Sequence, residues 1–221
     1  MLTVHHLGVS QSERIVWLCE ELGIDYVLKH YDRVPPGRGP APPEYKALHP
    51  LGTAPIITDG DVVLPESGAI MEYIIGRYGA GRLAVAPDAP NFADYLFWFH
   101  FANASMLPSQ TGAPRDGGEE SPRAQFMRAR SERAWTLVEA RLGASAYFAG
   151  DELTAADIIM VFNLTTMRVF FPRDLSPYPN ILSYLKNHRR AAGLSQSDAE
   201  GRPADGVPPE LIHPAAVEPQ A

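Results

Sequence analysis

The stretch TAPIITDGDVVLPESGAI, residues 53–70, places a proline at the start of an apolar run and an acid beside a hydroxyl where a helical pattern begins. Its apolar segments APIIT and VVL flank Asp59-Gly60-Asp61, a turn signal that predicts a β-hairpin. Because proline has no N–H, Pro55 belongs at the first residue of a strand or at a sheet edge. The stretch therefore indicates a strand, a tight turn, a second strand and the start of a helix.

A cis bond between Ala54 and Pro55 would turn the backbone N–H and C=O of Ala54 outward. A bound peptide could then pair with Ala54 as an added strand pairs with a sheet edge. Cis bonds occur at only about 5% of X–Pro positions, so these two residues alone do not establish one. The hypothesis of a peptide-binding edge therefore needs support from neighbouring residues.

Glu66 and Ser67 stand where the helical pattern of residues 67–79 begins. The N-terminus of a helix has free N–H groups and a partial positive charge, so Ser67 can cap the helix or offer its hydroxyl and N–H to an anion. Glu66 beside it suits an ammonium group. The pair would fit the α-amino acid end of a ligand, which carries both charges, and simple helix capping is the alternative interpretation.

Periodicity on both sides of this stretch extends it into a small α/β unit. Residues 2–6 and 25–31 read as strands, and residues 12–23 repeat apolar side chains at spacings of three and four, as one helix face does. Residues 33–43 contain too many prolines and glycines for regular structure and are expected to form a surface loop. The predicted order is β-α-β, a short helix, and β-β-α.

After residue 90, helical patterns replace strand patterns. They cover residues 91–107, 121–143, 153–171 and 178–190. Beyond 195, proline and acidic residues accompany weak periodicity, which is typical of a loose tail. We therefore expect an α/β domain at residues 1–80, an all-helical domain at 91–194 and a tail at 195–221.

Composition restricts the partners and the compartment. The chain has 221 residues, 45% of them hydrophobic, and a formal net charge of −7, which does not favour nucleic acid or an anionic membrane. No apolar run approaches the roughly 20 residues of a membrane span, and the first residues lack a signal-peptide pattern. The single cysteine, Cys19, excludes an internal disulfide. We expect a cytoplasmic protein.

Three segments resemble one known family. HPLGTAPIITDGDVVLPESGAIMEYI closely resembles the glutathione-binding stretch of cytosolic glutathione S-transferases, whose usual form is Asn-Pro-x-Gly-x-Val-Pro, a hairpin and Glu-Ser-x-Ala-Ile. HHLGVSQSERIVWLCEELG and GDELTAADI resemble further motifs of this family, as in fungal and bacterial members near the theta class. The resemblance covers residues 2–190 and implies a thioredoxin-like α/β domain, an all-α domain, a homodimer and a cis bond at Pro55.

The resemblance also implies where glutathione, the co-substrate, would bind. It implies pairing of the tripeptide with Ala54 and Pro55, and contacts of its γ-glutamyl end with Glu66 and Ser67. Many relatives carry a lysine where Thr53 stands, so one contact to the glycine carboxylate is expected to be missing. Arg38, in the proline-rich loop, is the proposed substitute, with Thr53 beside the ligand.

Ser10 and Ser12 are the candidates for the group that stabilises the glutathione thiolate. In the theta-like pattern the catalytic serine stands two residues before Ser/Pro-x-Arg, and S-Q-S-E-R puts Ser10 in that place. Ser12 is expected to cap the following helix, although an exchange of the two roles, with Ser12 contacting the thiol, stays open. No tyrosine occurs in residues 1–25, which disfavours the tyrosine-dependent version. Cys19 is interpreted as a core residue.

Other conspicuous residues are interpreted structurally, and no metal site is predicted. Adjacent His5 and His6 would face opposite sides of a strand, so we expect one to pack and the other to lie near solvent. Thr154 and Asp157 form a capping-box pattern, which predicts stability and not chemistry. A dense aromatic cluster should divide between the core, an electrophile pocket and a subunit contact; it comprises Tyr95, Phe97, Trp98, Phe99 and Phe101.

The favoured function from sequence is a glutathione transferase that adds the thiolate to an apolar electrophile. Conjugation, dehalogenation and peroxide reduction share the thiolate step, so a glutathione-dependent peroxidase is one alternative. The other is a non-catalytic binding or assembly module with the same fold. The identity of the electrophile depends on pocket geometry, which the sequence does not supply.

Overall fold

The computed structural model describes residues 1–36, 39–112 and 121–187. Arg38 and the proposed tail at 195–221 lie outside the described residues. The first part of the chain forms a four-stranded sheet of order β2-β1-β3-β4. Its strands are β1 (Leu2–Leu7), β2 (Val27–Tyr31), β3 (Ile56–Asp59) and β4 (Val62–Pro65).

The sheet has the connections predicted from the sequence. β1 pairs in parallel with β2 and antiparallel with β3, and β3 and β4 form the predicted hairpin around Gly60, whose φ is 58°. This left-handed backbone suits glycine, which lacks a Cβ. The helices of this part are α1 (Glu13–Leu22), α2 (Pro43–Lys46) and α3 (Ser67–Arg77).

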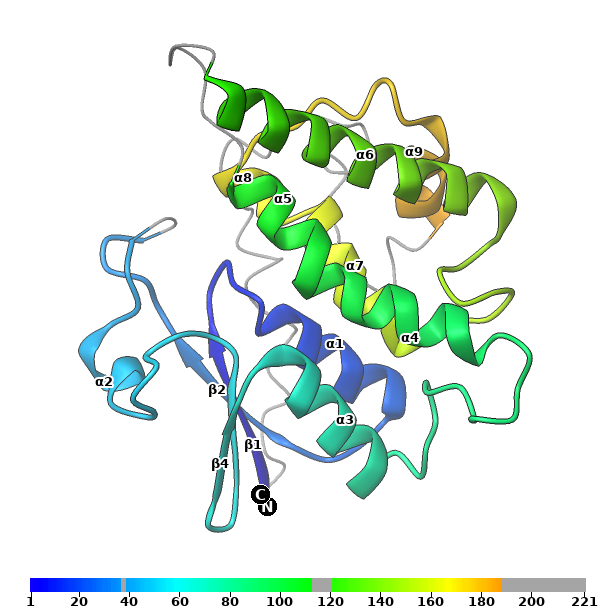
Figure 1. The fold of residues 1–221 in the computed structure, drawn as a ribbon. Helices are drawn as coiled ribbons and strands as arrows, with labels where there is room; N and C mark the ends of the chain where they lie inside the picture. The colour runs from blue at the N-terminus through cyan, green and yellow to red at the C-terminus, as the bar shows by residue number, and fades with distance from the viewer. Residues whose placement is uncertain (37–38, 113–120, 188–221) are drawn as a thin grey trace.

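The two faces of the sheet are covered differently. α1 and α3 pack side by side on the face that is turned toward the helical part of the chain (Figure 1). On the other face, Tyr45 of α2 packs with Leu7, Tyr31 and Ile56. The alternation of β1 therefore directs successive side chains into two separate environments.

The rest of the described chain is helical. Apart from one isolated bridge between Tyr147 and Gly150, the described residues after β4 contain no strand pairing, as predicted. The elements are α4 (Phe92–Phe101), the π-helix η1 (Ala102–Met106), α5 (Leu107–Thr111), α6 (Pro122–Ala144), α7 (Ala155–Leu164), α8 (Met167–Phe170) and α9 (Pro179–Asn187).

Two of the predicted helices are less regular than the periodicity indicates. The segment 91–107 widens into η1, which ends two residues before Pro108, because a proline ring clashes with the carbonyl four residues earlier in a regular helix. The segment 153–171 is interrupted at Thr165, whose φ and ψ are −121° and −95°, and divides into α7 and α8.

α7 is the central helix, and every one of its residues is buried. It packs against α1 of the α/β part and α4 of the helical part, which explains its nearly continuous apolar sequence. The predicted capping box is confirmed at its start: the Thr154 hydroxyl accepts from the Ala156 N–H, and the Asp157 carboxylate accepts from the Thr154 N–H at 2.9 Å.

Asp157 also joins α7 to its neighbours. Its carboxylate accepts hydrogen bonds from the Phe148 N–H at 2.9 Å and the Tyr184 hydroxyl at 3.0 Å. Burial raises the pKa of Asp157, and these hydrogen bonds act in the opposite direction. The carboxylate is thus a structural acceptor that connects α7, α9 and the preceding loop.

Replacing Asp157 by alanine is expected to lower the free energy of unfolding by about 3 kcal/mol, because buried donors lose their acceptor. Urea denaturation measures this change. Asp174→Ala is the control, since within the described part of the chain exposed Asp174 accepts hydrogen bonds from Ser176 alone; the free energy of unfolding should fall by less than about 1 kcal/mol. Equal stabilities of the two variants would contradict the structural role of Asp157.

Candidate functional site

The loop between β1 and α1 holds Ser10 in an unusual backbone setting. Val9 has a φ of 51°, a left-handed value that is an outlier for a β-branched residue and persists only with support. Arg33 supplies that support: its Nε donates to the Gly8 carbonyl at 2.7 Å and its Nη2 to the Val9 carbonyl at 2.9 Å. Arg33, which follows β2, therefore holds the backbone just before Ser10 in place.

Ser10 is 5% exposed, and its hydroxyl lies within a small hydrogen-bonded group. Its Oγ donates to the Leu7 carbonyl at 2.6 Å and lies 2.8 Å from the Ser12 Oγ. The Ser10 N–H donates to the Glu13 carboxylate at 3.2 Å. The Ser10 hydroxyl therefore lies just beyond the end of β1, close to the first turn of α1.

The expectation that the Ser12 side chain caps α1 is wrong. Ser12 stands at the N-cap position, but its φ and ψ are helical (−66°, −18°) and its hydroxyl makes no capping bond. It instead bonds back to β1: it accepts from the Leu7 N–H at 3.1 Å and lies 2.9 Å from the His6 Nδ1. Side-chain capping usually requires extended dihedrals, which direct the hydroxyl over the helix end.

The start of α3 does not use Glu66 or Ser67 as a side-chain cap either. Glu66 is the N-cap residue, exposed, with φ 75° and ψ 118°, and its side chain makes no capping bond. A non-glycine residue in this region costs of the order of 1–3 kcal/mol and is typical of functional sites. Ser67 is the first helical residue and is buried.

Ser67 and the Ser10 loop are joined through Gln11 and Arg14. The Gln11 Oε1 accepts from the Ser67 hydroxyl at 3.2 Å and from the Arg14 Nη1 at 2.5 Å. The same Nη1 lies 3.3 Å from the Ser67 Oγ and donates to the Asn103 Oδ1 of η1 at 2.9 Å. The structure thus brings the loop before α1, the start of α3 and the helical part together.

Arg14 was not assigned a role from the sequence. It is 1% exposed, and its guanidinium lies 4.8 Å from the centre of the Phe162 ring. Burial lowers the pKa of Arg14 to about 9, so the group remains a cation at neutral pH. Among the described residues, its Nε and Nη2 have no hydrogen-bond partner. The sequence feature that could have indicated a buried arginine is the position of Arg14 directly before the apolar run IVWLC.

Glu13 makes a second connection across the two parts of the chain. One carboxylate oxygen accepts from the Ser10 N–H, and the other accepts from the Thr166 hydroxyl at 2.6 Å. Because Thr166 lies between α7 and α8, the loop that carries Ser10 is attached to the helical part as well as to the sheet. The site is built at the junction of the two parts.

The segment before β3 has the predicted backbone. The Ala54–Pro55 bond is cis, as is Val34–Pro35. Pro55 is buried, Ala54 is half-buried and Thr53 is exposed. Within the described parts of the chain, the hydrogen bonds of turns and loops do not involve the backbone of Ala54. Its N–H and C=O therefore have the setting that strand-like pairing with a peptide requires.

Most of the other residues singled out from the sequence are buried. Cys19 is fully buried, as expected, and burial raises the pKa of its thiol to about 12, which disfavours a nucleophile. His5 and His6 are both buried, so the expectation of one histidine near solvent is wrong: α2 covers one face and α1 the other. Of the aromatic cluster, Tyr95, Trp98 and Phe99 are buried and Phe97 is exposed.

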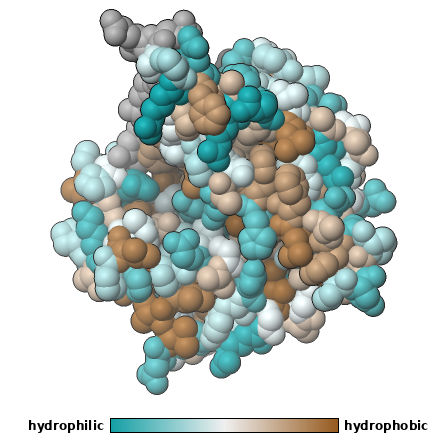
Figure 2. Space-filling model, in the orientation of Figure 1, coloured by the Kyte–Doolittle hydropathy of each residue, from teal (hydrophilic) through white to brown (hydrophobic). Residues whose placement is uncertain are grey.

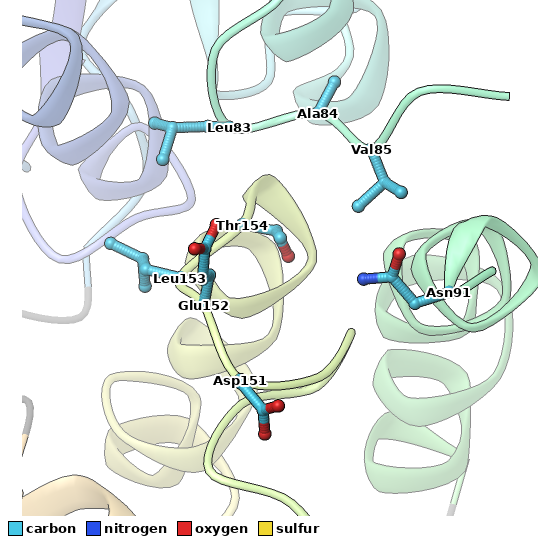
Figure 3. A pocket seen from close by; sticks show the side chains of 8 residues that line it. All are labelled: Leu83, Ala84, Val85, Asn91, Asp151, Glu152, Leu153 and Thr154. Carbon is cyan, nitrogen blue, oxygen red and sulfur yellow. The ribbon is translucent and has the colours of Figure 1, made fainter. Parts of the chain in front are cut away.

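A separate cavity of about 330 Å³ lies at the linker between the two parts. Figure 3 shows the linker residues on one side, Asn91 beside α4, and the loop before α7 opposite. It is lined by Leu83, Ala84, Val85, Asn91, Asp151, Glu152, Leu153 and Thr154. None of the predicted site residues lines it, so the cavity is distinct from the Ser10–Ser67 site.

The described residues carry neither a cluster of metal-ligating side chains nor a membrane-spanning helix. Within the ranges 1–36, 39–112 and 121–187, histidine, cysteine and acidic side chains do not form a group that could hold a metal ion. No helix in those ranges has the length and apolar character needed to cross a membrane.

Comparison with known proteins places this architecture. Residues 10–75 match the family described as glutathione S-transferase, N-terminal domain, and residues 119–187 match glutathione S-transferase, C-terminal domain. The chain belongs to the glutathione S-transferase family. Glutathione S-transferase 3 of Schizosaccharomyces pombe is 32% identical over 203 residues, which are 84% of this chain and 82% of that protein.

Solved structures of glutathione S-transferases share the fold. One from Actinobacillus pleuropneumoniae is 32% identical, has a TM-score of 0.79, and the match covers 96% of this chain and 100% of that one. A glutathione transferase of Phanerochaete chrysosporium, solved in complex with oxidized glutathione, is 21% identical with a TM-score of 0.66 and covers 87% and 93%. The thioredoxin-like first part and the helical second part expected from sequence are confirmed.

The acceptor role of Gln11 can be tested with two substitutions of similar size. Gln11→Leu is expected to lower the free energy of unfolding by about 1–3 kcal/mol, because buried Arg14 and Ser67 lose a shared acceptor. Gln11→Glu keeps that acceptor and adds a carboxylate for the guanidinium, so it should be at least as stable as the wild type. Denaturant unfolding of both variants measures the difference, and a leucine variant of wild-type stability would contradict the role.

Proposed function

We propose that this glutathione S-transferase activates glutathione through Ser10 and transfers its sulfur to an apolar electrophile. One observation carries the proposal: Gln11 connects the buried Ser10 loop to the start of α3, and the cis Ala54–Pro55 bond precedes Ile56, which pairs with Pro65 just before α3. The family membership and the name of the Schizosaccharomyces pombe relative support an enzyme that uses glutathione as its co-substrate.

The energetic demand on Ser10 is modest. A free thiol has a pKa near 8.5 and is only a few per cent ionised at neutral pH, whereas the thiolate is the nucleophile. Lowering the pKa by about two units requires about 2.7 kcal/mol of preference for the anion. A hydrogen bond to a charged group supplies about 1.5–3 kcal/mol, so one well-placed hydroxyl is sufficient.

The peptide part of glutathione is proposed to bind along the segment before β3 and at the start of α3. The backbone of Ala54 pairs with the peptide, and the exposed Glu66 carboxylate binds its ammonium group. The N–H groups at the start of α3, with the Arg14 cation behind Ser67, favour its carboxylate. Thr53 and Arg38 remain proposed contacts to the glycine end.

Ser12 is left out of the proposed ligand contacts. Its side chain is completely buried, and its hydroxyl is engaged with β1 and Ser10. The exchange of roles that the sequence left open is therefore not favoured. Ser12 can influence glutathione only through the groups that it contacts.

The apolar electrophile is proposed to bind between the Ser10 loop and the helical domain, where η1 approaches α1. We retain the domain boundaries 1–80 and 91–194, the tail at 195–221 and a cytoplasmic location as proposals. Conjugation of this kind would serve detoxification, and peroxide reduction would use the same thiolate. A non-catalytic module is the alternative that the following experiments separate from an enzyme.

A homodimer is proposed from the exposed apolar face of α4. Phe97 is 49% exposed and stacks on Phe101 at 5.4 Å, next to exposed Leu96. Hydrophobic side chains gather along α4 in Figure 2, on the side of the molecule that also carries α3. Exposed apolar groups of this kind mark interaction surfaces in soluble proteins.

Sedimentation is expected to show a dimer for the wild type and a monomer for Phe97→Glu, because the introduced charge would be buried without a partner. Phe126→Glu is the control: Phe126 is 59% exposed, but it lies on α6. A dimer that persists in Phe97→Glu would place the subunit contact elsewhere.

Ser10→Ala is expected to raise the pKa of the bound glutathione thiol by about one to two units, because the anion loses its hydroxyl donor. Turnover with a chloronitrobenzene substrate at neutral pH should fall by about tenfold or more, while the dissociation constant of glutathione stays close to that of the wild type. The thiolate absorbance of the binary complex, recorded against pH, measures the ionisation directly.

Glu66→Gln is the matched control, since it removes a charge proposed for binding and leaves the thiol environment intact. Glutathione affinity should fall by about tenfold without a change in the pKa of the bound thiol. Turnover equal to the wild type in Ser10→Ala would reject Ser10 as the activating group. Failure of the wild type to bind glutathione would favour the non-catalytic module.

A further inference from the structure

His6, Ser12 and Ser10 form a continuous chain of hydrogen-bonding side chains. The His6 Nδ1 lies 2.9 Å from the Ser12 Oγ, which lies 2.8 Å from the Ser10 Oγ. All three residues are buried, and they come from β1, the N-cap of α1 and the loop between them. A buried ring nitrogen is thereby connected to the hydroxyl proposed to face the thiol.

The alternation of β1 explains why His6, and not His5, enters this chain. His6 lies on the face covered by α1, and its ring centre is 5.4 Å from that of His30 on β2. His5 lies on the opposite face, where its ring nitrogens bond to the Tyr31 hydroxyl at 3.0 Å and the Thr58 hydroxyl at 3.1 Å. The two histidines are neighbours in sequence with separate partners.

The Ser10 hydroxyl has one proton but two acceptors to serve, the Leu7 carbonyl and the proposed thiolate. Each serine hydroxyl has one proton to donate. The Ser10 proton is directed at the Leu7 carbonyl, 2.6 Å away, so it is not available to a thiolate in this arrangement. The Ser12 Oγ lies 3.2 Å from the same carbonyl and is the group that can replace Ser10 as its donor.

Ser12 can make this replacement only if its own proton is not used elsewhere. If the His6 Nδ1 carries no proton, it accepts the proton of Ser12, and Ser10 must keep its bond to Leu7. If the His6 Nδ1 carries a proton, it donates to the Ser12 Oγ. The Ser12 proton can then serve the Leu7 carbonyl in place of the Ser10 proton, and the Ser10 hydroxyl is released to donate elsewhere.

We infer that His6 is a positioning residue: by donating from Nδ1 to Ser12, it frees the Ser10 hydroxyl to donate to the glutathione thiolate. This inference rests on the proposed role of Ser10 and adds a requirement for one protonation form of a buried histidine. His6 touches no substrate; it acts through Ser12. Which nitrogen of a histidine carries the proton is set by its partners, and here the partner is a hydroxyl that can accept or donate.

The test compares His6→Phe, which removes the donor, with His6→Asn, which keeps an amide N–H the same number of bonds from the backbone. With glutathione bound, His6→Phe should raise the pKa of the thiol by about one unit, a tenfold loss of thiolate at neutral pH. Its glutathione affinity should match that of the wild type. His6→Asn should restore most of the ionisation, and His5→Phe, on the same strand, should leave it unchanged.

A wild-type thiol pKa in folded His6→Phe, with a raised pKa in Ser10→Ala, would overturn the inference and leave the proposed function intact. A wild-type pKa in both variants would overturn both, since Ser10 would not be the donor. Should His6→Phe fail to fold, the pKa of the bound glutathione thiol in Ser12→Ala tests the hydrogen-bonded chain. This variant leaves the Leu7 carbonyl to Ser10, so a raised thiol pKa supports the chain and a wild-type pKa overturns it.

Discussion

The buried cation of Arg14 is the constraint on which the site depends. One of its nitrogens contacts Gln11 in the first loop, Ser67 at the start of α3 and Asn103 in η1, so a single group joins three segments that are distant in sequence. These three partners are neutral, and burial lowers the pKa of Arg14, although the adjacent Glu13 carboxylate acts in the opposite direction. Because the Arg14 Nη1 lies 3.3 Å from the Ser67 Oγ, an anionic ligand bound at the start of α3 would further stabilise the buried cation.

Local patterns were sufficient to predict most of the fold. The hairpin at Gly60, the burial of Cys19 and the capping box of Thr154 and Asp157 each follow from residues close together in sequence. The cis bond at Pro55 did not follow from local preference and came from the family resemblance. Local rules succeeded where a structure depends on residues that are close together in sequence.

Contacts between distant segments are what the sequence did not supply. Ser12 and Ser67 both looked like helix caps, yet both hydroxyls bond to groups elsewhere: Ser12 to β1, and Ser67 to Gln11. A serine at a helix start has the same local pattern whether it caps or is drawn to a partner from another element. The roles of Arg14 and His6 were not predicted for the same reason, since they depend on contacts with elements that are distant in sequence.

The π-helix η1 shows how one residue can shape a distant site. Pro108 cannot donate to the carbonyl of Ala104 and would clash with it, so the chain widens just before the proline. Within the widened turn, Asn103 reaches Arg14 and the Ala102 carbonyl accepts from the Asn163 side chain at 3.1 Å. Because Asn163 belongs to α7, the same turn contacts the central helix through a backbone carbonyl and the buried cation through a side chain.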